Sequence, residues 1–212
     1  MKKQCLARIN NRGFTLAELL IGLFVSAIVM TTILSAYYSQ NKSYAVQEQV
    51  AAMVQNLRAA MDIMIREIRM AGYDPTGTAN AGIVTANTTS ITITQDLDGD
   101  GSVAGDENIT YALADSDGDG DNDLERNNDL IAENIDALDF LYLDETGNPT
   151  AVPSEIRAVQ ITMVAKTGRG DRGYVDSVVY TNQQGTGILG PINDNSRRKR
   201  LTAEVRCRNM GL

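Results

Sequence analysis

The residues best suited to chemistry lie in a glycine-rich acidic stretch, DLDGDGSVAGDE, at positions 96–107. Calcium prefers oxygen ligands, and a twelve-residue loop can supply them from positions 1, 3, 5, 7 and 12, with a glycine at the sharp turn. Gly101 stands at that turn. The candidate ligands are Asp96, Asp98, Asp100, the backbone carbonyl of Ser102, and Glu107. The spacing predicts a calcium loop, and a solvated Asp/Gly turn without an ion is the alternative.

A second acidic stretch, at positions 115–126, begins in the same way but ends differently. Arg126 stands at the twelfth position, where a carboxylate would be needed to complete the loop. An exposed acidic loop is therefore favoured over an ion site. A looser calcium site stays open as the alternative, with Asp115, Asp117, Asp119, Asp121 and Asp123 as its candidate ligands.

The composition excludes several other kinds of site. The chain contains no histidine, so neither a histidine-dependent catalytic triad nor a Cys/His zinc site can be built from it. Its two cysteines, Cys5 and Cys207, lie at opposite ends of the sequence, and loss of residues 1–13 would leave Cys207 without an intramolecular partner. The carboxylates lie in glycine-rich loops with no predicted apolar pocket to shift a pKa, so we do not expect an enzyme.

The charge is distributed unevenly along the chain. Residues 1–13 hold four of the 19 basic residues and no acid, which leaves 15 basic and 27 acidic residues, a formal charge of −12, in the rest of the sequence. Nucleic-acid binding depends largely on Lys and Arg contacts to phosphate. An acidic body therefore argues against a nucleic-acid partner.

An apolar segment, residues 14–36, precedes the acidic body of the chain. It contains one charge, Glu18, and as a helix it would rise roughly 35 Å, enough to cross a hydrocarbon core of about 30 Å. Basic residues precede it and the acidic body follows it, so the N-terminus is expected in the cytoplasm. A secretory signal peptide would have a shorter apolar region. A plain signal anchor remains an alternative.

The next segment, residues 37–72, is predicted to continue the same helix as an amphipathic half. Apolar residues recur there every three or four positions, which is typical of a helix with one buried face. They are Val46, Val50, Met53, Val54, Leu57, Met61, Met64, Ile65 and Ile68. The sequence Gly72-Tyr73-Asp74-Pro75 should end the helix, because glycine can adopt the left-handed cap and proline cannot continue the helix.

The remaining residues, 73–212, are predicted to form a β-rich domain. Segments of period-two, β-branched sequence indicate strands. The expected strands are residues 90–95, 108–114, 137–144, 156–166, 176–181 and 201–208. Hairpin-like joins favour an antiparallel sheet, and the amphipathic half of the helix can cover one face of it. The fold class is therefore α+β: a long N-terminal helix, transmembrane and then amphipathic, packed on an antiparallel sheet.

The run RRKR at 197–200 is interpreted as a solvated charge run protecting an edge strand, or as a contact for an acidic surface.

The sequence GFTLAELL at 13–20, after a short basic leader, resembles the cleavage and methylation motif of type IV prepilins and type II secretion pseudopilins. The resemblance implies a pilin-like fold, a leader of residues 1–13 that a prepilin peptidase removes between Gly13 and Phe14, and methylation of the new N-terminus. It also implies that Glu18 pairs with the Phe14 amine of an adjacent subunit. A charge in an apolar span is costly and needs a partner; snorkelling of Glu18 to the headgroups is the alternative.

Further segments look like the PilW group of minor pilins: REIRMAGYDP, ENIDALDFLYLD, IRAVQITMVAKTG and RRKRLTAEVRCRN. This resemblance implies a minor pilin that aids filament assembly or initiation, with major and minor pilins, a prepilin peptidase and an inner-membrane assembly platform as partners. The chain would span the bacterial inner membrane once and later join a periplasmic or extracellular filament. The alternatives are a J-type minor pseudopilin of type II secretion and, in another class, a membrane-anchored, calcium-dependent adhesin or binding module.

Overall fold

The computed structural model describes residues 13–211. Cys5 and all of the expected leader except Gly13 lie outside the described residues. A single helix, α1 (Leu16–Met70), is 55 residues long, as the uninterrupted sequence predicts. The chain divides into two compact units between Val46 and Gln47, and each is described by itself.

The first unit contains the apolar half of α1, and its side chains are exposed from Leu16 to Ala45. Leu23, Phe24 and Ile28 each expose more than half of their surface. By length and composition this helix can cross a membrane. No described residue of this unit covers these apolar side chains, so they are free to contact lipid or other helices.

The second unit contains the amphipathic half of α1, which buries one face. The buried residues are Met53, Leu57, Ala60, Met61, Met64 and Ile68. Each large apolar side chain contributes about 1.5–3 kcal/mol when fully buried, so this face holds the helix on the β-domain. The helix ends at Met70; Gly72 has φ 81° and donates its N–H to the Thr94 carbonyl at 3.0 Å. Glycine therefore provides the predicted left-handed cap.

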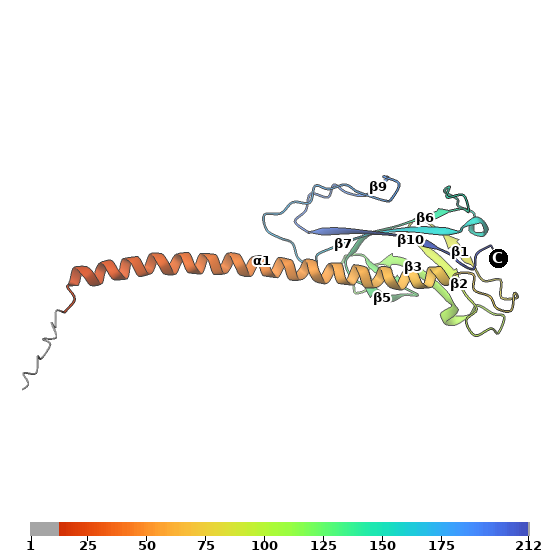
Figure 1. The fold of residues 1–212 in the computed structure, drawn as a ribbon, viewed down its shortest axis with the longest axis horizontal. Helices are drawn as coiled ribbons and strands as arrows, with labels where there is room; N and C mark the ends of the chain where they lie inside the picture. The colour runs from red at the N-terminus through yellow and green to blue at the C-terminus, as the bar shows by residue number, and fades with distance from the viewer. Residues whose placement is uncertain (1–12, 212) are drawn as a thin grey trace, which may run out of the picture. The chain divides into compact units, whose positions relative to one another are not determined.

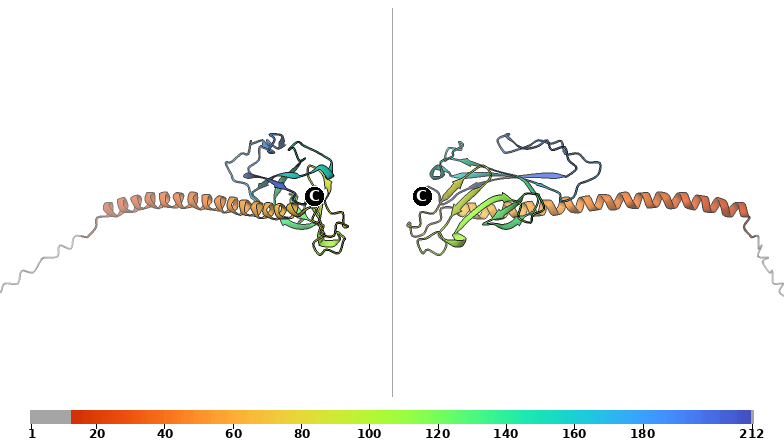
Figure 2. Two further views of the ribbon diagram at one scale, coloured as in Figure 1. Left: turned by 45° about the vertical axis from the view of Figure 1, so that its right-hand side comes forward. Right: turned by 180° about the vertical axis from the view of Figure 1, so that it is seen from behind.

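Two antiparallel sheets lie against this half of the helix and share its core (Figures 1 and 2). The larger sheet has the order β1-β2-β3-β4-β5 and the smaller has the order β10-β7-β6. The larger sheet comprises β1 (Ile83–Ala86), β2 (Ile91–Thr94), β3 (Asn108–Ala114), β4 (Asp123–Arg126) and β5 (Asp129–Ala132). The smaller sheet comprises β6 (Ile135–Leu143), β7 (Ala158–Lys166) and β10 (Arg198–Arg206). Two short 3-10 helices are η1 (Gly105–Glu107) and η2 (Pro153–Glu155).

The predicted strands agree with β3 at both ends and with β2, β6 and β7 to within two residues at each end. The prediction missed β1, β4 and β5, which are four residues each. Strands β4 (DLER) and β5 (DLIA) contain Asp and Glu, which are depleted in strands. The strand expected at 176–181 is wrong over most of its length, because only β8 (Tyr180–Thr181) is paired there, with β9 (Gly187–Leu189). Strand β10 begins three residues earlier than expected, because Arg198, Lys199 and Arg200 pair with β7.

Residues 167–197, here called the arm, connect β7 to β10 and contain the β8–β9 hairpin. Polar contacts attach the arm to the smaller sheet. Asn182 Nδ2 donates to Asp139 Oδ2 at 3.1 Å, Gln183 Nε2 to the Ala203 carbonyl at 2.9 Å, and Gln184 Nε2 to Gln160 Oε1 at 3.1 Å. The core cluster contains no arm residue among the residues described. The arm is therefore fastened by hydrogen bonds and ion pairs.

Arg198 fastens the base of the arm and corrects the prediction that the whole basic run is solvated. Its side chain is 2% exposed and contacts three carboxylates. The N–O distances are 2.5 Å to Asp136, 3.1 Å to Asp176 and 2.6 Å to Asp194. The hydrogen bond from Arg198 lowers the pKa of the Asp194 carboxyl. Lys199 is exposed, as the prediction has it.

Cys207 is a free, buried thiol immediately after β10. Burial raises its pKa to about 12, and the thiolate is the reactive form. In a Cys5→Ser chain, maleimide should therefore modify Cys207 far more slowly in the native state than in concentrated urea at the same pH. Intact mass over time measures both rates, and equal rates would contradict the buried position.

Candidate functional sites in the N-terminal motif and the acidic loops

The start of α1 is closed by a reciprocal pair of side chains. The Thr15 N–H and hydroxyl both donate to Glu18 Oε2, at 2.8 and 2.7 Å, and the Glu18 N–H donates to Thr15 Oγ1 at 3.3 Å. This arrangement is a capping box, which satisfies backbone donors that the first turn of a helix leaves unpaired. The sequence interpretation gave Glu18 only a partner in another subunit. The spacing Thr-x-x-Glu before an apolar run was the signal that could have revealed the local partner.

Gly13 and Phe14 precede the helix and are both exposed. Phe14 exposes 88% of its surface, and a Cβ added at Gly13 would meet nothing within 4 Å. The peptide bond between them lies in non-helical backbone. A protease needs such backbone, because a helical bond is held in its own hydrogen-bonded turn.

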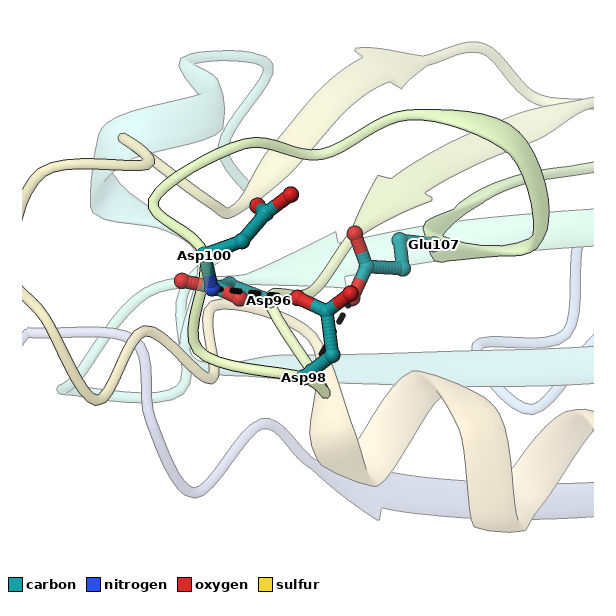
Figure 3. Close-up of side chains that lie close together, drawn as sticks. All are labelled: Asp96, Asp98, Asp100 and Glu107. Carbon is teal, nitrogen blue, oxygen red and sulfur yellow. Dashed lines mark hydrogen bonds between the residues drawn. The ribbon is translucent and has the colours of Figure 1, made fainter.

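The first acidic loop joins β2 to β3, two paired antiparallel strands. It brings together carboxylate oxygens of Asp96, Asp98, Asp100 and Glu107, all within 4.8 Å of one another (Figure 3). The predicted loop is therefore confirmed as a cluster of oxygen donors on a hairpin. The Ser102 N–H donates to Asp100 Oδ1 at 2.8 Å.

Backbone hydrogen bonds hold this loop in shape. Asp96 is fully buried and accepts N–H groups from Gly99 at 2.7 Å and Gly101 at 3.1 Å. Glu107 Oε1 accepts the Leu97 N–H at 2.6 Å. Gly101 has φ 83°, and a Cβ there would lie 2.6 Å from Thr78 Oγ1. Glycine is therefore required at the sharp turn, both for its backbone angle and for the close approach.

The second acidic loop joins β3 to β4 and gathers only part of its expected set. Asp115, Asp117 and Asp119 bring oxygens within 4.8 Å of one another. Asp121 instead pairs with Lys166. Asp123 is buried and accepts the Asn134 N–H at 2.9 Å. Asp121 and Asp123 therefore lie outside this group of three, and their role as ligands stays a prediction.

Arg126, at the twelfth position of that stretch, turns toward the helix. Its Nε lies 3.1 Å from Glu67 Oε2, and the Tyr111 hydroxyl donates to the same oxygen at 2.5 Å. Burial raises the pKa of Tyr111 most, and the hydrogen bond to Glu67 raises it further. This contact ties α1 to the larger sheet and leaves the second loop without a closing group.

Comparisons with known proteins agree with the N-terminal motif and the fold. Residues 8–34 match a family model described as the prokaryotic N-terminal methylation motif. The fold is similar to that of a type IV-like pilin from Thermus thermophilus, with a TM-score of 0.51 and 14% identity over 74% of this chain and 98% of that chain. A comparison with curated proteins gives no match.

The α+β prediction of a long helix packed on antiparallel strands is confirmed. The motif implies processing by a prepilin peptidase and assembly with pilins in general. An exposed apolar helix after that motif is consistent with a start in the inner membrane and a later place in a pilus. The chain is thus a type IV pilin-like protein in its fold, and it carries the prokaryotic N-terminal methylation motif.

Proposed function

We propose that this chain is a minor pilin of a type IV pilus, a structural subunit that joins the filament through its N-terminal helix and aids assembly or initiation. One observation carries the proposal: the methylation motif at residues 8–34 leads into a helix whose apolar side chains are exposed. Such a helix can exchange lipid for neighbouring helices without refolding. The PilW-like sequence segments support the minor role.

In this function Gly13 and Phe14 mark the cut, Phe14 carries the methylated amine, and Glu18 pairs with that amine on the next subunit. Glu18 has a partner before assembly as well, because Thr15 donates to its carboxylate at 2.7 Å through the hydroxyl. The local cap reduces the cost of holding the carboxylate near an apolar span. Assembly then adds an opposite charge to a carboxylate that is already held in place.

Intact mass and N-terminal sequencing of the chain from native membranes, with and without prepilin peptidase, test the proposal. We expect a chain that begins at methylated Phe14 only when the peptidase is active. A Gly13→Leu chain should stay uncut even with the peptidase present, because the bulky side chain obstructs the site. An uncut wild-type chain beginning at Met1 would mean a plain membrane anchor.

A J-type minor pseudopilin is the second candidate, since the same motif and fold would serve it. Recovery of the chain in sheared surface pili favours the pilus. Recovery only with a periplasmic pseudopilus, together with a secretion defect on deletion, favours type II secretion.

We further propose that the first acidic loop binds Ca²⁺ through Asp96, Asp98, Asp100, Glu107 and the Ser102 carbonyl. The gathered carboxylates support this, because hard oxygen donors suit calcium and like charges at such separations repel without a cation. Extracellular calcium sites have Kd values on the order of 10⁻⁴–10⁻³ M. The bound ion would fasten the β2–β3 hairpin, and this role would also serve a calcium-dependent binding surface.

Calorimetric titration of the full chain in detergent, after treatment with a chelator, should show calcium binding in that range. Glu107→Gln should weaken it at least tenfold, because it removes one charged ligand. Glu133→Gln, at an exposed acid outside both loops, is the matched control and should bind as the wild type does. Equal affinities of the Glu107→Gln and wild-type chains would contradict the site.

A further inference from the structure

Three tyrosines follow directly on the apolar part of α1. Tyr37, Tyr38 and Tyr44 are 58%, 70% and 59% exposed. The rings of Tyr37 and Tyr38 meet edge to face, with centroids 6.1 Å apart, and Gln40 Nε2 donates to the Tyr44 hydroxyl at 3.2 Å. No packing among residues 13–46 of this unit explains why three large aromatic side chains lie on an exposed stretch of helix.

Their position along the helix matches the thickness of a bilayer. Glu18 and Tyr38 are twenty positions apart, a rise of about 30 Å at about 1.5 Å per residue, which equals the hydrocarbon thickness. No charged side chain stands between Glu18 and Lys42. When Tyr38 lies at one boundary of the hydrocarbon, Glu18 therefore lies at the other.

Tyrosine suits that boundary chemically. Its ring is apolar and its hydroxyl donates and accepts hydrogen bonds, so tyrosine is enriched where acyl chains meet headgroups. Tyr37 and Tyr44 are seven residues apart, two turns on the same side of the helix and about 10 Å along its axis. Tyr37 and Tyr38 can therefore sit at the ester groups, and Tyr44 can reach the headgroups.

We propose that Tyr37, Tyr38 and Tyr44 form an interfacial anchor that binds the ester and headgroup region of the outer phospholipid leaflet and sets the depth of the unassembled subunit. The anchor places Glu18 at the inner boundary, where a carboxylate costs less than at the midplane. This inference goes beyond the proposed function but rests on its membrane-spanning step. The partner is a phospholipid bilayer, recognised by its thickness and by its interfacial oxygens.

The absence of tryptophan from the chain makes a single introduced indole a clean depth reporter. The full chain would be reconstituted into vesicles of phosphatidylethanolamine and phosphatidylglycerol containing phosphatidylcholine brominated near either the ester end or the methyl end of its acyl chains. In Tyr38→Trp, ester-end bromine should quench the fluorescence most. In the matched variant Ile28→Trp, about 15 Å closer to the midplane, methyl-end bromine should quench most.

Two results for Tyr38→Trp would overturn the anchor: stronger quenching by methyl-end bromine than by ester-end bromine, or no quenching by either lipid. If Ile28→Trp is still quenched most by methyl-end bromine, the membrane span stays intact. An Ile28→Trp chain that no brominated lipid quenches would overturn the membrane span and the proposed function with it.

The depth-setting role has its own test in the Ile28→Trp chain. With Tyr37, Tyr38 and Tyr44 all changed to Ala, the ratio of quenching by methyl-end bromine to quenching by ester-end bromine should fall at least twofold, because the helix no longer has a fixed depth. An unchanged quenching ratio would show that the tyrosines do not set the depth of the helix.

Discussion

A Glu18→Gln chain should be cut and methylated like the wild type but fall at least tenfold in the filament fraction. Glutamine keeps the capping box, because its amide oxygen can still accept from Thr15 at the N3 position, so the helix start survives. The substitution removes the charge that would pair with the Phe14 amine of the neighbouring subunit. A buried amine left without its partner is strongly unfavourable.

The measurement is the ratio of subunit in sheared filaments to subunit in total membranes, by immunoblot, with intact mass to verify processing. Glu48→Gln, at an exposed position on the same helix, is the matched control and should leave the ratio unchanged. Thr15→Val would separate the two roles of Glu18: it removes the hydroxyl of the cap but keeps the charge, so it should reduce incorporation less than Glu18→Gln does. Wild-type incorporation of Glu18→Gln would show that the charge has no role in assembly.

Arg198→Met should destabilise the β-domain by about 3–5 kcal/mol, the usual cost of breaking a buried ion pair. The side chain of Asp176 is 1% exposed, so its carboxylate would stay buried after Arg198 is removed. Asp136 is 14% exposed and would keep Lys166, whose Nζ lies 3.7 Å away. The arm should loosen first, because Arg198 joins Asp176 and Asp194 of the arm to Asp136 of β6.

Urea unfolding of the full chain in detergent measures the loss of stability. Alkylation of the buried Cys207, in a Cys5→Ser background, reports the unfolded fraction at each urea concentration. Lys199→Met changes the neighbouring exposed residue and should shift the free energy of unfolding by less than about 0.5 kcal/mol. Adding Asp176→Asn to Arg198→Met should recover part of the loss, because it removes one uncompensated charge. Similar urea midpoints for Arg198→Met and Lys199→Met would contradict a stabilising role for the Arg198 ion pairs.

Local patterns in the sequence predict those parts of the molecule whose partners are near in the chain. Periodicity predicts α1, and the spacing of Asp96, Asp98 and Asp100 predicts their cluster, because the loop and its hairpin are both local. The strands β4 (DLER) and β5 (DLIA) contain Asp and Glu, which are depleted in strands, so residue propensity does not reveal them. Each becomes a strand through pairing with its neighbour, β4 with β3 and β5 with β4.

Arg198 shows why the remaining structure could not be predicted. Its run of like charges resembles a solvated segment, and one of its partners, Asp136, is 62 residues away. The contact of Asp121 with Lys166 could not be predicted for the same reason, because the two residues are 45 positions apart. Only the folded sheet brings these charges together. The capping box of Thr15 and Glu18, by contrast, is local and was open to prediction from its spacing.

The tip of the β8–β9 hairpin offers a permissive position in the chain. Gln183, Gln184 and Gly185 are exposed, and the turn closes on itself through the Asn182 N–H, which donates to the Thr186 carbonyl at 2.8 Å. Inserted sequence after Gly185 would displace no core side chain. It would also keep Gln183 and Gln184, whose side chains donate to the Ala203 carbonyl and to Gln160 of the smaller sheet. The tip can therefore carry an epitope tag that makes the chain visible by immunogold microscopy.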